Sequence, residues 1–278
     1  MNLKTQYYVS ATITILLWAF ATADTQLDEF QPKALVFKAN FSKPTISQAF
    51  GGARISYGEQ NVILWASGGG IEVHYPAGSY SPEGPIIGGF GVWTDHPVPG
   101  DTASFKYSVF FPAGFNFVKG GKLPGLYGGR KQCAGGDPAV DCFSTRVMWR
   151  ESGKGELYLY ANREAQDPAI CQMPNNYCAP YYGWSLNTGA FTFKTGEWTD
   201  IQEVIRMNTP GQRNGLLSIR VNGKEVIRYD NIVFRIADYP NMRIEGMDVD
   251  TFFGGTGTEW ATPTHQLTKF REFILETV

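Results

Sequence analysis

The stretch 216–229 reads LLSIRVNGKEVIRY and decides the fold class. Two runs of alternating apolar and polar residues flank the dipeptide Asn222-Gly223. An Asn-Gly pair between such runs is typical of a two-residue turn in a β-hairpin. We therefore predict two antiparallel strands at 216–221 and 224–229.

Similar short apolar runs, separated by Gly, Pro and Asn, continue on both sides of this hairpin. We predict further strands at 62–65, 70–75, 105–111, 144–150, 156–160, 191–193, 198–207 and 269–276. No pattern of three or more helical turns interrupts them. Many short strands without long helical connections favour antiparallel pairing. The sequence therefore predicts one all-β domain over 24–278, a two-sheet antiparallel β-jelly roll with a concave sheet on which a polymer can lie.

The N-terminus has the pattern of a secretory signal peptide. Lys4 precedes an apolar core at 13–20, and Ala21-Thr22-Ala23 is a small-x-small cleavage site. The apolar run is shorter than the roughly 20 residues that cross a bilayer. We therefore predict a signal peptide at 1–23, a secreted extracellular protein and no membrane partner.

Charge and composition exclude several function classes. The formal net charge of -2 and a pI near 6.0 argue against binding of nucleic acid through bulk positive charge. The three histidines, His74, His96 and His265, form no metal-binding spacing. We expect no metal, no cofactor and a monomer.

Secretion makes the four cysteines candidates for disulfides. Four cysteines allow three pairings, and we favour the two local ones, Cys133–Cys142 and Cys171–Cys178. Each would close and restrain a short loop, which suits the rim of a binding site.

The stretch 120–129, GGKLPGLYGG, has five glycines and a proline around Lys122. This composition predicts a tight loop that can approach a ligand closely. It lacks the G-x4-G-K-[ST] spacing of a phosphate-binding loop. The alternative is an ordinary solvated lysine in a surface loop.

Two predicted strands follow this stretch and are joined by a hairpin at 152–155. Side chains alternate along a strand, so Ser144, Arg146, Met148 and Arg150 share one face. In the partner strand Glu156, Tyr158 and Tyr160 share one face, and Leu157 and Leu159 take the opposite, core-facing side. We expect the two polar faces to lie side by side. The alternative is a solvated sheet face.

A basic face that carries tyrosines suits β-elimination in a uronic-acid polymer. The proton at C5 becomes acidic only when the charge of the neighbouring carboxylate is neutralised, which Lys122 and the forked guanidinium of Arg146 can do. A base then removes this proton, and an acid protonates the departing oxygen.

Several of these runs together resemble polysaccharide lyase family fourteen. They are 110–112, 115–129, 142–150, 157–160 and 251–255. The resemblance implies a β-jelly roll whose concave cleft binds a polyuronate such as alginate or glucuronan. It places the family's loop lysine at Lys122, its S-x-R strand at Ser144 and Arg146, and its Y-x-Y strand at Tyr158 and Tyr160.

These residues lead to an assignment of roles. We expect Lys122 and Arg146 to bind or neutralise the substrate carboxylate, and Tyr158 or Tyr160 to act as base and acid. A lysine of lowered pKa is an alternative base. We expect further substrate contacts from the residues Ser144, Arg150, Tyr127 and His74.

The sequence also fits two other functions. A carbohydrate-binding jelly roll would use the same basic face to hold an anionic glycan without cleaving it. A glycoside hydrolase would use Asp248 and Asp250, or Glu156, as its acid pair. The two aspartates of Asp248-Val249-Asp250 also fit a calcium site or an ion-paired strand face.

Overall fold

A computed structural model describes residues 30–278 of the chain. The chain divides into the units Met1–Gln31 and Pro32–Val278, and the fold described below is that of the second. The predicted signal peptide at 1–23 lies outside the described residues.

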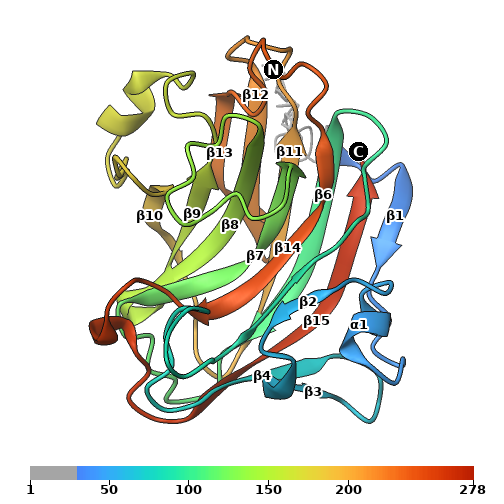
Figure 1. Ribbon diagram of the computed structural model, residues 1–278, viewed down its shortest axis with the longest axis vertical. Helices are drawn as coiled ribbons and strands as arrows, with labels where there is room; N and C mark the ends of the chain where they lie inside the picture. Colours follow the sequence, from blue (N-terminus) through green and yellow to red (C-terminus); the bar gives the residue numbers. More distant parts are fainter. Residues whose placement is uncertain (1–29) are drawn as a thin grey trace, which may run out of the picture. The chain divides into compact units, whose positions relative to one another are not determined.

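The fold consists of two antiparallel sheets (Figure 1). The first has the order β13 (Lys224–Ile232), β12 (Gly215–Val221), β11 (Trp198–Arg206), β6 (Thr102–Phe110), β15 (Gln266–Thr277), β4 (Ile71–Tyr75) and β3 (Val62–Leu64), with β1 (Ala34–Lys38) paired to β15. The second has the order β10 (Trp184–Thr192), β9 (Lys154–Tyr160), β8 (Cys142–Arg150), β7 (Gly120–Gly129), β14 (Ile244–Phe253), β5 (Phe90–Trp93) and β2 (Ile55–Tyr57). The predicted all-β, two-sheet architecture is confirmed.

Helical segments in the described part of the chain are short. They are the α-helix α1 (Ile46–Ala49) and the 3-10 turns η2 (Glu59–Asn61), η3 (Glu151–Gly153), η4 (Pro168–Gln172) and η5 (Thr258–Trp260). None of the helices in the described residues is both long and apolar enough to cross a membrane.

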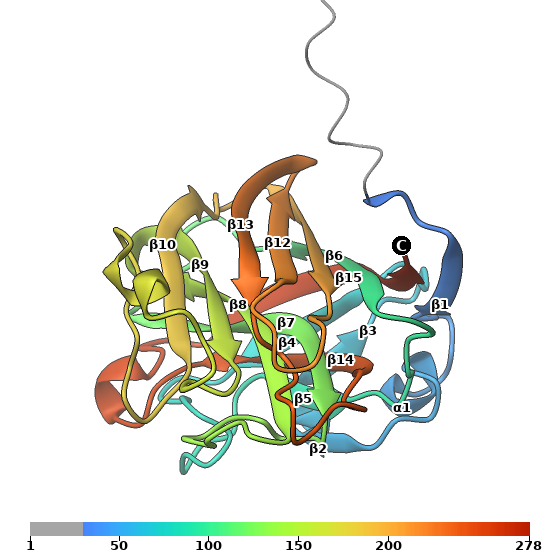
Figure 2. The ribbon, with the colours of Figure 1, turned by 90° about the horizontal axis from the view of Figure 1, so that it is seen from above.

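The core lies between the two sheets, which form two layers in Figure 2. Phe105 and Val109 point into it from β6, and Leu157 and Leu159 point into it from β9. Burial of apolar surface in this core stabilises the folded state by about 25 cal/mol per Å². Alternation along 156–160 predicts that the leucines of β9 face the core, and they do. The tyrosines of that strand therefore face outward.

The hairpin at 216–229 forms as predicted. Val221 pairs with Lys224, and the two residues between them have positive φ angles, 50° at Asn222 and 80° at Gly223. Both values belong to the left-handed region that this turn requires and that Asn and Gly adopt at low cost.

The prediction of a loop at 120–129 is wrong, because this stretch is strand β7 in the middle of the seven-stranded sheet. Its glycines make room for large groups on the neighbouring strands. A Cβ atom at Gly121 would collide with the Trp149 indole, and one at Gly128 would collide with the Phe143 ring. A composition typical of loops here reflects close packing against bulky neighbours.

Both favoured disulfides are present. Cys133 is bonded to Cys142, and Cys171 is bonded to Cys178, with Cα–Cα distances of 5.8 and 5.6 Å. The first closes the connection between β7 and β8. The second lies in the segment between β9 and β10, drawn in yellow beside β10 (Figures 1 and 2).

Candidate functional site

The strand register gathers most of the predicted site residues on the outer face of the seven-stranded sheet. Arg146 pairs with Tyr158 and Ser144 pairs with Tyr160. On the other side of β8, Lys122 of β7 pairs with Met148. Residues that pair directly across antiparallel strands share a face, so these side chains lie together on one side of the sheet, which we call the basic–tyrosine face.

The Lys122 amine lies at the centre of this face. Its Nζ is 3.4 Å from the centre of the Tyr158 ring and 2.9 Å from Sδ of Met148. Only 9% of the residue is exposed. The amine is therefore surrounded by groups that solvate a positive charge much less well than water does.

Electrostatics favour the neutral form of this amine. Burial lowers the pKa of Lys122 well below its usual value, and the charges of Arg146 and Arg150 lower it further. The charges of Glu156 and Asp248 act in the opposite direction but do not outweigh these effects. Lys122 therefore fits the role of a proton acceptor.

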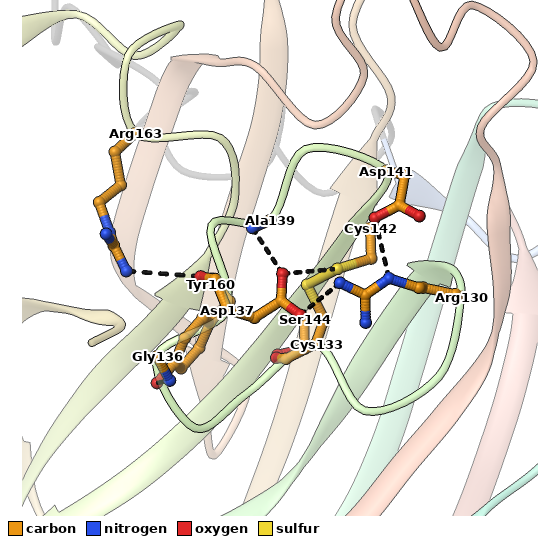
Figure 3. The surroundings of a disulfide bond; sticks show 10 residues. All are labelled: Arg130, Cys133, Gly136, Asp137, Ala139, Asp141, Cys142, Ser144, Tyr160 and Arg163. Atoms are coloured by element: carbon orange, nitrogen blue, oxygen red, sulfur yellow. Dashed lines mark hydrogen bonds and ion pairs between the residues drawn. A yellow bond between two sulfur atoms is a disulfide. The ribbon is translucent and has the colours of Figure 1, made fainter. Parts of the chain in front are cut away.

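The two tyrosines of the face lie in edge contact, with 5.6 Å between their ring centres. The Tyr160 hydroxyl oxygen accepts a hydrogen bond of 3.3 Å from the backbone N–H of Gly136, in the loop that the Cys133–Cys142 disulfide closes (Figure 3). Tyr160 is the acceptor in this bond, so its own phenolic proton is not used there. Burial and the neighbouring Tyr160 raise the pKa of Tyr158, so it stays protonated.

Arg146 lies beneath the face with two carboxylates that the sequence did not assign to the site. Its side chain is 2% exposed, with Nε 3.4 Å from Oδ2 of Asp248 and Nη1 3.6 Å from Oδ2 of Asp250. Alternation along Asp248-Val249-Asp250 predicts that both aspartates lie on one face of a strand, and an ion-paired face is one of the interpretations that the sequence allows. The sequence could not show that the partner is Arg146, because β14 reaches it across β7.

Arg150 is a more accessible guanidinium, with 21% of its side chain exposed. Its Nε donates to Oε1 of Glu156 at 2.8 Å, and its Nη2 donates to the Ser185 hydroxyl at 2.7 Å. Glu156 is fully buried and also accepts from the Thr188 hydroxyl at 2.5 Å. The carboxylate therefore fixes the position of a guanidinium that still reaches solvent.

Ser144 and Tyr127 belong to the same face, but both have partners inside the protein. The Ser144 hydroxyl donates to the Cys133 carbonyl at 2.6 Å, and the Tyr127 hydroxyl donates to the Thr94 carbonyl at 2.7 Å. Neither residue is more than 1% exposed. Their hydrogen bonds hold the strands and the disulfide loop around the face.

His74 does not lie at this site, which corrects the expectation that it lines the substrate cleft. It lies on β4, in the other sheet, on the side of that strand opposite the buried Val73 and Tyr75. Its Nδ1 is 2.9 Å from Nε2 of His265. A strand's own residues do not reveal which sheet it joins, so the sequence could not separate His74 from the tyrosine strand.

Gly125 lies between Arg146 and Asp248 in the strand register, and its substitution is expected to damage the site. A Cβ atom here would collide with the Thr145 carbonyl oxygen. We expect Gly125→Ala to lower the free energy of unfolding by about 2 kcal/mol or more, measured by urea denaturation. Gly69→Ala, where a Cβ meets no atom closer than 3.6 Å, is a control with a smaller expected loss.

Comparison with known proteins gives concordant matches. The profile of the family Polysaccharide lyase 14 matches residues 66–273. The protein named exolysin of Paramecium bursaria Chlorella virus 1 is 28% identical over 185 residues, which cover 57% of this chain and 27% of that protein. The chain thus spans about a quarter of the length of this relative.

Solved structures resemble the whole domain. The marine PL-14 alginate lyase from Aplysia kurodai is 28% identical, with a TM-score of 0.77 over 88% of this chain and 100% of that chain. An alginate lyase from Chlorella virus shares the fold, at 23% identity and a TM-score of 0.72 over 88% of this chain and 100% of that one. The profile match covers most of the described domain, and the chain belongs to the polysaccharide lyase 14 family.

Proposed function

We propose that this protein is a secreted, extracellular polysaccharide lyase that cleaves a uronic-acid polymer by β-elimination and leaves an unsaturated uronate end. The observation that carries the proposal is the Lys122 amine of lowered pKa, which lies on the ring of Tyr158 and beside a second phenol and two guanidinium groups. We propose that it acts as a monomer and uses no metal or cofactor.

The first requirement of β-elimination is neutralisation of the uronate carboxylate. We assign this contact to Arg150, whose guanidinium is partly exposed and held in place by Glu156. Arg146 is buried and paired with two aspartates. It therefore contributes positive charge from beneath the substrate, in place of the direct contact that we expected from the sequence.

The second requirement is a base for the proton at C5. We assign this role to the neutral amine of Lys122, because burial and two neighbouring arginines lower its pKa. The electron pair of the C5–H bond moves to form the C4–C5 double bond, and the bond from C4 to the glycosidic oxygen breaks.

The third requirement is an acid for the departing oxygen. We assign it to Tyr160, whose hydroxyl oxygen accepts a hydrogen bond from the Gly136 N–H and whose own proton is not used in that bond. The same N–H stabilises the phenolate that remains after transfer. Tyr158 supports the Lys122 amine with its ring and keeps its own proton.

Alginate is the substrate that we favour, because the Aplysia kurodai relative, at 28% identity, is named an alginate lyase. Glucuronan is the alternative, since it also carries a carboxylate on every sugar. The basic–tyrosine face suits either polymer.

The geometry disfavours a glycoside hydrolase. Its acid pair would be drawn from Asp248, Asp250 and Glu156, but each of these carboxylates is buried and paired with an arginine. A hydrolytic pair must flank the bond and activate water between its members. A simple binding module would have no need for a lysine of lowered pKa at the centre of the face.

The test is an ultraviolet scan for the conjugated double bond of an unsaturated uronate. The mature protein is mixed separately with polymannuronate, polyguluronate and glucuronan, and reducing ends are counted in parallel. We expect absorbance and reducing ends to rise together on one polymer. Reducing ends without absorbance would indicate a hydrolase, and no change in either readout would contradict the proposal.

A further inference from the structure

Asp248 and Arg146 meet beneath the basic–tyrosine face because a glycine separates them. In the register of β14, β7 and β8, Asp248 pairs with Gly125, and Gly125 pairs with Arg146. With no side chain between them, the guanidinium spans β7 and reaches the carboxylate. Asp250 reaches the same guanidinium from two residues further along β14.

A second glycine connects Asp250 to the edge of the sheet. Gly91 of β5 pairs with Asp250, and a Cβ atom at Gly91 would collide with both the Asp250 carboxylate and the Tyr57 ring. Burial and the charge of Asp250 raise the pKa of Tyr57 well above its usual value, so it stays a phenol. A row of polar groups therefore runs beneath the face from β2 to β9.

One guanidinium in this row faces two carboxylates. Oδ1 and Oδ2 of Asp248 and Oδ1 of Asp250 are buried and make no hydrogen bond of regular geometry with the described residues, although Arg146 and Tyr57 lie beside them. Two buried charges of the same sign cost more than one cation can offset, so a proton shared by the pair lowers the free energy. Burial and the charge of Asp248 raise the pKa of Asp250 well above its usual value.

The charge of the aspartates reaches the residues assigned to the reaction. Arg146 pairs with Tyr158, and its Cζ lies 5.9 Å from the centre of the Tyr160 ring. The charge of Arg146 lowers the pKa of Lys122, whereas the charge of Asp248 raises it. Loss of the Asp248 charge would remove this opposing effect and lower the pKa of Lys122 further.

We propose that Asp248 and Asp250 are positioning residues of the lyase reaction, which share one proton, hold the Arg146 guanidinium beneath the two tyrosines and set the electrostatic environment of the Lys122 amine. Asp250 carries the proton and Asp248 carries the negative charge. Both are buried and touch no substrate. This inference rests on the proposed function.

Other titratable groups interact with this cluster from the surrounding strands. They are Tyr57 on β2, Tyr75 on β4, Lys122 and Tyr127 on β7, Tyr158 and Tyr160 on β9, and Glu203 on β11. Burial raises the pKa of Tyr75, so it stays neutral with Tyr57, and it raises the pKa of Glu203 to about 8. Well below pH 8 Glu203, Tyr57 and Tyr75 are therefore neutral.

Isosteric variants separate the two aspartates. In Asp250→Asn the amide N–H takes the place of the shared proton, and we expect kcat to fall only about threefold. Alanine cannot donate a hydrogen bond, so we expect kcat of Asp250→Ala to fall at least about thirtyfold. In Asp248→Asn the negative charge moves to Asp250, which no longer faces a second carboxylate, and so leaves the position from which it acts on Lys122. We expect kcat to fall at least about thirtyfold with KM changed less than about threefold.

The pH dependence of kcat/KM distinguishes positioning from a purely structural role. We expect the acid limb for Asp248→Asn to move to lower pH by about one unit, because the pKa of Lys122 falls. The exposed Asp238→Asn serves as the control and keeps the wild-type profile. Lower thermal stability with an unmoved acid limb would overturn the inference and leave the proposed function intact.

The shared proton has a readout that needs no activity. We expect one aspartate carboxyl group of the wild type to keep the ¹³C chemical shift of a protonated carboxyl at pH 6. This signal is expected to be missing in Asp250→Asn. Two ionised carboxylates at pH 6 would overturn the inference. A wild type that cleaves no polyuronate would instead overturn the proposed function.

Discussion

Lys122→Ala is expected to lower kcat on the polymer by at least about a thousandfold, because it removes the group that accepts the C5 proton. Lys122→Arg is expected to be nearly as inactive. Arginine keeps a positive charge but does not lose its proton near neutral pH, so it cannot act as a base. The pair of variants therefore separates proton transfer from charge neutralisation.

Initial rates of ultraviolet absorbance measure both variants. Lys119→Ala, whose side chain is 53% exposed three residues earlier, is the matched control and is expected to keep kcat within about twofold. For the wild type we expect kcat/KM to rise with pH as the Lys122 amine loses its proton, at a pH well below the usual lysine pKa. An active Lys122→Arg variant would assign the lysine to carboxylate binding and return the base to a tyrosine.

Glu203→Gln is expected to stabilise the protein strongly at alkaline pH. Glu203 lies on β11 in the core between the sheets, where its Oε1 accepts a hydrogen bond from the Thr145 hydroxyl. Burial raises the pKa of this carboxyl from 4.5 to about 8. The folded protein therefore holds a proton that the unfolded chain releases at neutral pH.

The sign of the effect follows from proton linkage. The stability that the protonated carboxyl contributes is fully present below pH 4.5 and is lost as the pH rises to about 8. Over this window the free energy of unfolding falls by roughly 4 kcal/mol. Glutamine does not titrate, so the variant escapes this loss.

Urea denaturation at pH 5 and pH 9 measures the difference. We expect the free energy of unfolding of Glu203→Gln, relative to that of the wild type, to be about 4 kcal/mol higher at pH 9 than at pH 5. Glu197→Gln, at a side chain that is 64% exposed, should show no such change. Equal pH dependence in Glu203→Gln and the wild type would contradict a protonated carboxyl in the core.

Local patterns in the sequence predicted those parts of the fold that depend on neighbouring residues. The Asn222-Gly223 turn and the outward tyrosines of 156–160 depend on backbone preference and on alternation, and both are found. The two disulfides join cysteines nine and seven residues apart. In each case the partner lies nearby in the chain.

Other features depend on contacts between distant segments, and the sequence could not place them. Asp248 reaches Arg146 from more than one hundred residues away. His74 belongs to the other sheet because β4 pairs with β15. The glycines of 120–129 looked like a loop because the large side chains that occupy their space, such as Trp149, belong to other strands.

In the proposed reaction the glycosidic bond breaks by elimination, without addition of water. The most direct test is digestion of polymannuronate, polyguluronate and glucuronan in H₂¹⁸O, followed at once by mass spectrometry of the oligosaccharides. We predict products with unsaturated ends, each lighter by one water than a hydrolysis product, and no ¹⁸O introduced by cleavage. Saturated products that carry one ¹⁸O for each bond cleaved would contradict the account.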